Sequence, residues 1–402
     1  MANVKVSLIG ALDMLKFKNM AKVREQEIQA APAKDIAPEL KINANAKALH
    51  PDFIPAVVSE IVEHPEAGAK TFVFSRPDGS PLPYFRAGQY LSVKLHIGDS
   101  YISRPYSISS APEWALQGKY AITVKANPGG FAADWMLANL KVGDKLVLSS
   151  PQGEFFYEHL RDSKSVIALA GGSGITPFLS MAYAIRDGAE DFNLTILFGS
   201  RTESGILFKK ELDAICAACD KVTVVHVLSD EEKEGYEHGF ITAELIRKYA
   251  PENFSIFVCG PTAMYRFLSK EIEKLNLPRR LVRSEALGVT KQVWEQPGYP
   301  MGAKDKTFTV QVKQGPNHYT IQASANEPVL VAVERAGIKA PSRCRSGQCG
   351  WCRSRLVSGQ CYILPDGDGR RWADLQSGQI HPCASFPVSD LEIEVPGEYW
   401  EE

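Results

Sequence analysis

The amino-acid sequence predicts a multidomain α/β and β protein: a β-barrel or sandwich, a doubly wound parallel α/β domain, and a smaller strand-rich unit. Three observations predict this order. Residues 51–157 contain short strands divided by turn clusters, residues 158–288 alternate apolar strands with helices, and residues 307–402 hold five of the eight cysteines. The length of 402 residues agrees with about three domains of roughly 150 residues.

Composition narrows the class of protein. The 45 lysines and arginines against 47 aspartates and glutamates give a formal net charge of −2, so the chain lacks the basic excess of a nucleic-acid-binding domain. Hydrophobic residues make up 45% and charged residues 23%, as in globular domains, which excludes wholesale disorder. Eight cysteines are too few for a small disulfide scaffold.

Residues 1–50 are predicted to form an extension made of a basic helix and a linker. Leu8, Leu12 and Leu15 share one helical face, and the first 25 residues carry five basic against two acidic side chains. Such a helix can lie on a membrane surface or on a partner, pack on its own chain or subunit, or form an accessory lid. The apolar patch 6–12 is cut short by Asp13 and followed by Lys16 and Lys18, whereas a secretory signal places its charge before a longer apolar core, so we expect a cytoplasmic protein.

The strands of residues 51–157 are predicted in order along the chain. They cover 55–63, 70–76, 89–97, 100–110, 119–126 and 145–150, with a helical pattern at 131–140. Short strands at this spacing, divided by Gly, Pro, Asn and Asp clusters, are typical of a barrel or sandwich.

Residues 158–288 show the opposite pattern. Apolar strands at 165–172, 193–200, 221–229 and 254–260 alternate with helices at 175–188, 206–218, 241–250 and 261–276. Continuous apolar strands that alternate with helices predict a parallel sheet covered on both faces. The uncharged stretch 165–185 is long enough for a membrane span, but three glycines and Pro177 break it, so a transmembrane protein is not expected. Residues 289–306 are predicted to be a linker.

Four cysteines have the spacing of a plant-type [2Fe–2S] ligand set. Cys344, Cys349 and Cys352 follow C-x4-C-x2-C, and Cys383 lies 31 residues further on. Two irons that share two sulfides need four thiolates. A zinc site is the alternative, but zinc usually takes paired C-x2-C knuckles, and a lone distant cysteine does not form one.

The remaining cysteines outside any motif are expected to be structural. Cys361 is predicted to be a small hydrophobic residue on a strand. Cys216 and Cys219 form a C-x2-C that is a redox pair in some proteins. Because they fall in the middle of a predicted helix with no strand before them, helix packing is expected instead.

Three further motifs carry the chemistry of nucleotide binding. Arg104-Pro105-Tyr106-Ser107 offers a cation for a phosphate, an aromatic for a flat ring and a hydroxyl donor. Gly171-Gly172-Ser173-Gly174-Ile175-Thr176-Pro177 follows a strand and opens a helix, as a phosphate-cradling loop does, although Pro177 replaces the third glycine of the dinucleotide fingerprint. Cys259-Gly260-Pro261 also ends a strand, where ligands of parallel sheets bind.

In this order, and followed by the cysteine set, the motifs resemble the ferredoxin–NADP reductase superfamily. The chain is similar to the single-chain reductases ordered flavin, nicotinamide and ferredoxin, among them reductase components of Rieske oxygenases, phenylacetyl-CoA oxygenase reductase and hybrid-cluster-protein reductase. The resemblance covers about 55–402. It implies a Greek-key flavin-binding barrel, a nucleotide-binding domain and a β-grasp ferredoxin domain.

The resemblance implies a flavin site. Arg104 would bind the flavin pyrophosphate, Tyr106 would pack on the isoalloxazine, and Ser107 would hydrogen-bond near flavin N5. Gly129 and Gly130, with the helix behind them, would receive the pyrophosphate. Ala133 stands where the family often has Ser or Thr, so one phosphate contact is missing. FAD is expected, with FMN as the alternative.

The resemblance also implies a site for NADH or NADPH. Gly171, Gly172, Gly174 and Thr176 would cradle the nucleotide, and Cys259, Gly260 and Pro261 would lie near the nicotinamide. Ser200 and Arg201 follow a strand, and Arg201 can clamp a 2′-phosphate, which tilts the expectation slightly toward NADPH.

Ser107, Cys259 and Glu285 are the expected catalytic residues. Glu285 matches a family glutamate near the flavin, and a solvent-facing charge at a strand end is the alternative. The aromatic residue that often follows it is Leu287 here.

By the same resemblance the chain is an NAD(P)H-dependent reductase. Hydride passes from NAD(P)H to flavin, and single electrons pass through the [2Fe–2S] cluster to a protein acceptor such as an oxygenase. Two alternatives stay open: an electron-input subunit of a larger membrane-associated or anaerobic complex docked through residues 1–50, and a redox-sensing or interaction module. Asp366, Asp368 and Asp374 would dock an acceptor or form a solvated face.

Overall fold

The computed structural model describes residues 20–31, 40–127, 129–285, 288 and 292–398. Contacts divide the chain into two units, Met1–Ala46 and Lys47–Glu402, and each is described by itself. Residues 20–30 are helical, whereas the predicted face of Leu8, Leu12 and Leu15 lies outside the described residues. The linker predicted within residues 1–50 is wrong in one part, because it contains helix α2 (Lys41–Leu49). Three alanines favour helix in this segment, and none of its residues is buried.

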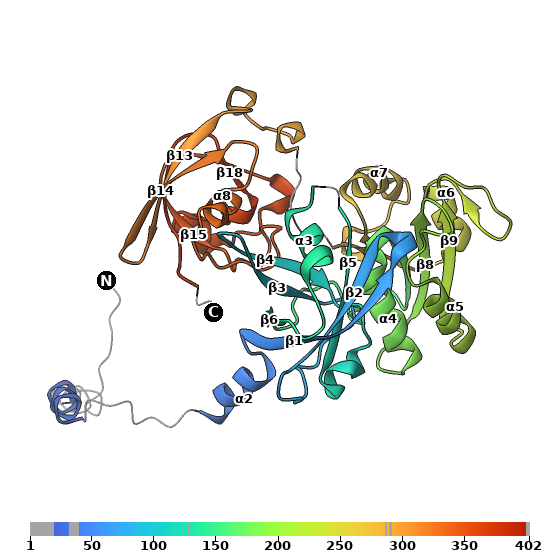
Figure 1. Ribbon diagram of the computed structural model, residues 1–402, viewed down its shortest axis with the longest axis horizontal. Coiled ribbons are helices and arrows are strands. Elements are labelled where there is room, and N and C mark those ends of the chain that lie inside the picture. The colour runs from blue at the N-terminus through green and yellow to red at the C-terminus, as the bar shows by residue number, and fades with distance from the viewer. Residues whose placement is uncertain (1–19, 32–39, 128, 286–287, 289–291, 399–402) are drawn as a thin grey trace, which may run out of the picture. The chain divides into compact units, whose positions relative to one another are not determined.

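An antiparallel six-stranded sheet forms the half-barrel that follows. Its order is β4-β3-β6-β1-β2-β5 (Figure 1), which confirms the predicted strand-rich domain. Its core contains Phe72, Phe74 and Tyr120, which are fully buried. The strands are β1 (Phe53–His64), β2 (Ala69–Ser75), β3 (Tyr90–Ile97), β4 (Ser100–Ser107), β5 (Lys119–Lys125) and β6 (Lys145–Ser149), and one helix, α3 (Phe131–Asn139), follows β5.

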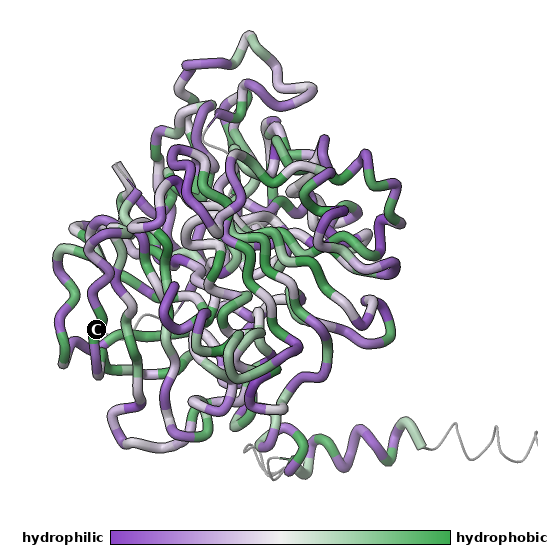
Figure 2. The backbone as a smooth tube through the Cα atoms, turned by 90° about the vertical axis from the view of Figure 1, so that its right-hand side faces the viewer, coloured by the Kyte–Doolittle hydropathy of each residue, from purple (hydrophilic) through white to green (hydrophobic). Residues whose placement is uncertain are grey.

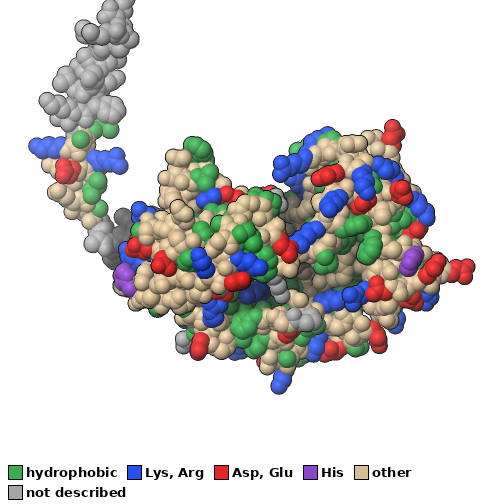
Figure 3. All heavy atoms as spheres, turned by 90° about the horizontal axis from the view of Figure 1, so that it is seen from above, with side chains coloured by type: hydrophobic (Ala, Val, Ile, Leu, Met, Phe, Trp, Pro, Cys, Tyr) green, Lys and Arg blue, Asp and Glu red, His purple; other side chains and the backbone are tan. Residues whose placement is uncertain are grey.

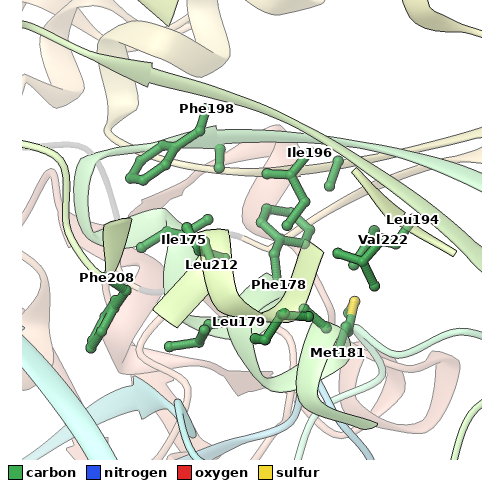
Figure 4. Close-up of a cluster of buried hydrophobic side chains, with 14 of the residues drawn as sticks. Ile175, Phe178, Leu179, Met181, Leu194, Ile196, Phe198, Phe208, Leu212 and Val222 are labelled. Atoms are coloured by element: carbon green, nitrogen blue, oxygen red, sulfur yellow. The ribbon is translucent and has the colours of Figure 1, made fainter. Parts of the chain in front are cut away.

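A parallel six-stranded sheet in the order β10-β9-β8-β7-β11-β12 confirms the predicted doubly wound domain. Helices α4 and α5 pack on one face through a core that includes Phe178, Ile196 and Leu212 (Figure 4), and α6 and α7 cover the other. The elements are β7 (Ser165–Gly171), α4 (Thr176–Arg186), β8 (Asn193–Ser200), α5 (Lys209–Ala218), β9 (Val222–Leu228), β10 (Glu237–His238), α6 (Ala243–Tyr249), β11 (Ser255–Cys259), α7 (Thr262–Glu273) and β12 (Val282–Ser284). The chain changes direction across the sheet between β7 and β11, so their carboxyl ends open the crevice where such sheets bind ligands.

The third region is a ferredoxin-like fold. A five-stranded sheet in the order β14-β13-β19-β15-β17 packs against helix α8. Its elements are β13 (Thr307–Gln314), β14 (Asn317–Ser324), α8 (Val329–Arg335), β15 (Ser354–Ser358), β17 (Gln379–Ile380) and β19 (Leu391–Glu394), beside the pair β16 (Cys361–Ile363) and β18 (Ser385–Pro387) and the short helix α9 (Trp372–Gln376).

Short 3-10 helices fill the connections. They are η1 (Pro65–Ala67), η2 (Pro112–Gln117), η3 (Gly172–Ile175), η4 (Arg279–Leu281), η5 (Val293–Glu295), η6 (Met301–Ala303), η7 (Pro365–Gly367) and η8 (Pro382–Ala384). Within the predicted linker 289–306, Val293 and Tyr299 are buried against Leu364 and Phe386, so this segment packs on the ferredoxin-like region. The domain boundaries themselves stay predictions.

Hydropathy follows the architecture. Apolar residues run along the central strands, and the outer turns are hydrophilic (Figure 2). Acidic and basic side chains intersperse over the face drawn in Figure 3. No helix among the described residues is long and apolar enough to cross a membrane. The pair Cys216 and Cys219 does not lie in the middle of a helix as predicted, because α5 ends at Ala218 and Cys219 is already extended.

Candidate functional site

A cavity of about 370 Å³ brings three sequence motifs together. It lies where the half-barrel meets the carboxyl ends of β7 and β11. Its lining includes Pro105, Tyr106, Ser107, Gly171, Gly172, Gly174, Thr176, Cys259, Gly260, Pro261 and Glu285, which are among the residues that the sequence predicted for the flavin and the nicotinamide. The three motifs are up to 157 positions apart in the chain, so their convergence depends on the fold.

Glu285 is a buried carboxylic acid in this cavity, with 7% of the residue exposed. The predicted alternative, a solvent-facing charge, is therefore wrong. Ser107 Oγ donates a hydrogen bond to Glu285 Oε2 at 2.9 Å, which joins the end of β4 to the residue after β12. Burial raises the pKa of Glu285 to about 8, while the bond from Ser107 opposes the shift. The group therefore holds a proton near neutral pH.

Cys259 lines this side of the cavity, and Tyr265 bonds the backbone of two other lining residues. Burial, and then the charge of Glu285, raise the pKa of the Cys259 thiol well above its usual range, which keeps the sulfur neutral. Tyr265, on α7, donates from its hydroxyl to the carbonyl of Glu285 and accepts from Gly260 N–H at 3.4 Å. The sequence reasoning missed Tyr265; its place one turn after the Cys259-Gly260-Pro261 motif is the signal that could have revealed it.

The glycine loop is shaped for close approach. A Cβ at Gly174 would lie 2.1 Å from the carbonyl oxygen of Cys259, so only glycine lets the loop reach the end of β11. Gly172 has φ +54°, which glycine adopts without strain. Thr176 opens α4 and donates from its hydroxyl to Ser173 O at 3.0 Å. The loop therefore packs directly on the end of β11, and its role as a phosphate cradle stays a prediction.

A second cavity of about 720 Å³ continues from the first along the sheet. It shares Lys125, Gly171, Gly172 and Pro261 with the first cavity. Its lining adds Ser200, Arg201, Phe240 and Phe267, and the two phenylalanine rings lie 5.6 Å apart between centroids.

Polar groups of the second cavity suit a polar, anionic ligand. Ser200 Oγ is buried without a hydrogen-bond partner among the described residues, and a bound ligand would satisfy it. Burial, and then the charge of Arg201, lower the pKa of Lys125. Two cations that face one cavity favour an anion such as a phosphate. Lys125 was not predicted, although it ends a strand just before the Asn127-Pro128-Gly129-Gly130 turn.

Arg104 lies elsewhere, on the side of the half-barrel that meets the ferredoxin-like region. Its guanidinium lies 3.7 Å from Glu334 of α8, and Glu334 also pairs with Arg345. Burial, and then repulsion from Arg345, lower the pKa of Arg104 to about 10. Two arginines share one carboxylate, so one positive charge is left to be matched by an anion. This imbalance fits a flavin phosphate at Arg104.

Gly129 and Gly130 do not line either cavity. Gly129 has φ +75°, and Gly130 N–H donates to Asp134 Oδ2 at 3.0 Å at the start of α3, so that amide already has an acceptor. Ala133 lies in the same helix, and Leu287 falls outside the described residues. The predicted pyrophosphate contact at these glycines stays a prediction.

The four predicted cluster cysteines lie together. Cys344, Cys352 and Cys383 are buried and Cys349 is exposed, and Sγ of Cys352 lies 3.3 Å from Sγ of Cys383. Hydrogen bonds from the thiols of Cys349 and Cys383 lower the pKa of Cys344. Cys361 lies apart on β16, partly buried against the sheet core.

Backbone amides are aimed at these sulfurs. Gly347 N–H donates to Cys383 Sγ at 3.3 Å, and Cys349 N–H donates to Cys344 Sγ at 3.4 Å. Amides that point at thiolate sulfurs are how a protein holds an iron–sulfur cluster and sets its potential. The residues present therefore fit a [2Fe–2S] cluster.

The ferredoxin-like region packs on the half-barrel next to the cluster loop. Arg343 stacks on Trp351 at 3.4 Å and donates to Asp52 O at 3.0 Å. Lys94, on β3, pairs with Glu398 at 3.4 Å. The Arg104–Glu334 pair lies in the same interface, and Glu334 gave no sequence signal because an isolated helical glutamate is ordinary.

The predicted acidic face is wrong for Asp374, whereas Asp368 is exposed as predicted. Asp374 is buried, accepting from Arg353 Nη1 at 2.9 Å and from Arg371 N–H at 2.9 Å. Asp368 pairs with Arg370 at 2.7 Å. Each of these two carboxylates pairs with an arginine of its own chain, and the side chain of Asp366 lies outside the described set.

Three families match the sequence in the predicted order. They are the oxidoreductase FAD-binding domain over residues 66–157, the oxidoreductase NAD-binding domain over 168–270 and the 2Fe-2S iron-sulfur cluster binding domain over 312–388. The chain belongs to the ferredoxin–NADP-reductase-like FAD/NAD reductases that end in a [2Fe–2S] ferredoxin domain. This confirms the predicted family, fold and cofactor types, and the chain is a flavin- and [2Fe–2S]-dependent NAD(P)H oxidoreductase.

Individual members of this reductase family are similar over most of their length. The glycine betaine monooxygenase reductase subunit of Chromohalobacter salexigens is 28% identical over 81% of this chain and 91% of its own. The ferredoxin reductase component of the 3-ketosteroid-9-alpha-monooxygenase of Mycobacterium tuberculosis is 28% identical over 83% and 93%. The structure of phthalate dioxygenase reductase aligns with TM-score 0.60 and 26% identity, over 86% of this chain and 98% of that one.

Proposed function

We propose that this reductase is the electron-donating component of an oxygenase system, and that it takes electrons from NADH or NADPH and delivers them to a separate oxygenase. One observation supports this proposal most strongly: FAD-, NAD- and [2Fe–2S]-binding domains follow one another in one chain. The chain aligns over most of its length with the reductase components of two monooxygenases and with phthalate dioxygenase reductase. The proposal includes a cytoplasmic location, where NAD(P)H is available.

In this proposal the chain's residues position the reactants. Hydride transfer needs the nicotinamide and the flavin ring stacked in register, which is a positioning task rather than one for a nucleophile or a metal. The first cavity, with Ser107, Cys259 and the protonated Glu285, would hold the two rings in a dry site. The glycine loop and the cations Lys125 and Arg201 would hold the nucleotide phosphates.

The cluster side would carry the electrons out. A bound flavin accepts two electrons at once and releases them singly, which the cluster requires. Cys344, Cys349, Cys352 and Cys383 would ligate the cluster, and Arg104 would anchor the flavin phosphate beside Glu334.

Purified holoprotein tests the proposal. Mixing it with NADH or NADPH under anaerobic conditions is expected to bleach flavin and cluster absorbance in succession, and steady turnover is expected with ferricyanide. Cys349→Ala is expected to lose iron and the rhombic electron paramagnetic resonance signal of the reduced cluster while flavin reduction persists. A redox-sensing module would take up electrons once without turnover. If Cys349→Ala keeps its iron and its signal, the ligand assignment is wrong.

The alternative of a larger complex docked through residues 1–50 has its own test. A variant beginning at residue 51 would be compared with the full chain for co-purifying proteins from native lysate. Loss of an obligate partner would favour the complex, and unchanged partners would rule out docking through this extension.

A further inference from the structure

Helix α9 presents an apolar and basic surface to solvent. Trp372 is 76% exposed and Leu375 is 46% exposed, and Arg371 next to them is exposed as well. With Arg353, these residues are named the α9 patch. Large apolar side chains that gather in water beside cations are typical of a protein-interaction surface.

The α9 patch adjoins the cluster loop. A Cβ at Gly369 would lie 2.6 Å from Gln348 Cα, and a Cβ at Gly347 would lie 1.9 Å from Gly367 O, so the segment before α9 lies directly on the loop. Trp372 follows Gly369 by three residues, which places it within about 11 Å along even a fully extended chain.

Contacts of Asp374 and His381 connect the patch to the cluster loop. Asp374, in α9, accepts from Arg353 and lies 3.9 Å from His381. The His381 ring in turn hydrogen-bonds the carbonyl of Gly347 in the cluster loop. The patch is therefore fixed relative to the cluster cysteines, as a surface for electron transfer must be.

The charge of the patch is positive. Its one carboxylate, Asp374, is 4% exposed and faces inward, while the Arg353 side chain is 54% exposed. Arg371 has no ion pair among the described residues. Two exposed residues follow Leu375, and neither of them, Gln376 or Ser377, carries a charge.

We propose that the α9 patch is where the acceptor protein docks, and that the acceptor meets it with an acidic rim around an apolar centre next to its electron-accepting group. This inference rests on the proposed function and adds that the recognition charge on this reductase is basic. Asp374 supports the patch from within. Charge complementarity of this kind raises the rate of productive encounter and decreases with salt.

Two haem proteins of opposite surface charge serve as probes. The holoprotein with NADH or NADPH would reduce cytochrome b5, which is acidic around its haem edge, and cytochrome c, which is basic there, at low and at high ionic strength. Arg371→Glu is expected to lower kcat/KM for cytochrome b5 by about fivefold at low salt and to raise it for cytochrome c, with both effects shrinking in high salt.

A matched control separates local from overall charge. Arg279→Glu makes the same charge change at an exposed position of the nucleotide-binding domain. Equal effects of Arg279→Glu and Arg371→Glu, or no effect of Arg371→Glu on either probe, would overturn the docking inference. The rate at which NAD(P)H bleaches flavin and cluster absorbance is expected to be unchanged in both variants. If the wild-type chain fails in that bleaching, the proposed function fails instead, so the two failures are distinguishable.

Discussion

Two buried glutamates stand on opposite sides of the flavin-binding half-barrel, and their surroundings differ. Glu285, on the nicotinamide side, has one hydroxyl partner, Ser107, and no ion pair among the described residues. Glu334, on the cluster side, faces the guanidinium groups of Arg104 and Arg345. The first carboxyl group holds a proton near neutral pH, and the second is held between two fixed positive charges.

This difference matches what each side must do. A hydride carries two electrons and is coupled to protons, so a protonatable group suits the side where hydride arrives. Single electrons leave through the cluster, and there a fixed arrangement of charges keeps the cluster loop against the half-barrel. Variants at either glutamate can break this contrast, and the largest effect is expected at Glu334.

Removing the carboxylate on the cluster side is expected to be costly. Glu334→Gln leaves two arginines buried side by side with no anion between them, and breaking a buried ion pair by removing one partner costs about 3–5 kcal/mol. Denaturant midpoints of the holoprotein, followed by cluster absorbance, measure this.

An exposed glutamate of the same domain provides the control for Glu334. Glu394 also lies between two cations, Lys313 at 3.0 Å and Arg355 at 3.6 Å, but all three side chains are at least 35% exposed. Glu394→Gln is expected to shift the midpoint much less, because water screens exposed pairs. Equal shifts of the denaturant midpoint in Glu334→Gln and Glu394→Gln would show that burial does not increase the contribution of Glu334 to stability.

Closing the cavity on the nicotinamide side is expected to affect rate more than stability. In Gly174→Ala the new methyl group would meet the carbonyl of Cys259, so the loop must move, and a misplacement of about 1 Å is enough to lower a rate about 100-fold. Anaerobic stopped-flow measurement of flavin reduction by NADH and NADPH checks this. Gly302→Ala is the control, since a Cβ there meets nothing within 4 Å. Unchanged flavin reduction in Gly174→Ala would remove the loop from the site.

The two sides also differ in how far the sequence predicted them. The cluster ligands follow from spacing, because three of them lie within nine residues and chain connectivity alone brings those three together. The fold class follows from periodicity for the same local reason. Ser107 and Glu285 are 178 positions apart, and only a family resemblance placed them together. Glu334 could not be predicted, since a buried charge is defined by its partners. Asp374 was mispredicted because the sequence shows its charge but not the contacts with Arg353 and Arg371 that accompany its burial.

Glu285 gives the protein a pH dependence with a defined sign. The folded carboxyl group has a pKa of about 8 and an ordinary glutamate one near 4.5, so between these values unfolding releases a proton. The free energy of unfolding therefore falls as pH rises through this window, by up to about 1.4 kcal/mol per unit. Glu285→Gln cannot titrate. The variant is expected to gain stability relative to wild type between pH 5 and pH 8, measured by thermal unfolding.

The same titration is expected in the kinetics. The wild-type rate constant for flavin reduction should inflect near pH 8, and the inflection should vanish in Glu285→Gln. The free energy of unfolding and the rate of flavin reduction are each compared across pH between wild type and Glu285→Gln. If both quantities change with pH in the same way in the two proteins, Glu285 is ionised throughout, and the contrast with Glu334 does not hold.

The smallest expected effect concerns the choice between NADH and NADPH. Arg201 lines the second cavity, but its side chain is 88% exposed and forms an ion pair with Asp230 at 3.7 Å. An exposed pair contributes about 1 kcal/mol at most, so Arg201→Ala is expected to raise KM for NADPH by less than about tenfold and to leave KM for NADH within about twofold. Asp230→Asn frees the guanidinium and is expected to lower KM for NADPH. Because the 2′-phosphate is the sole difference between the nucleotides, equal changes for both would show that Arg201 acts on the shared pyrophosphate instead.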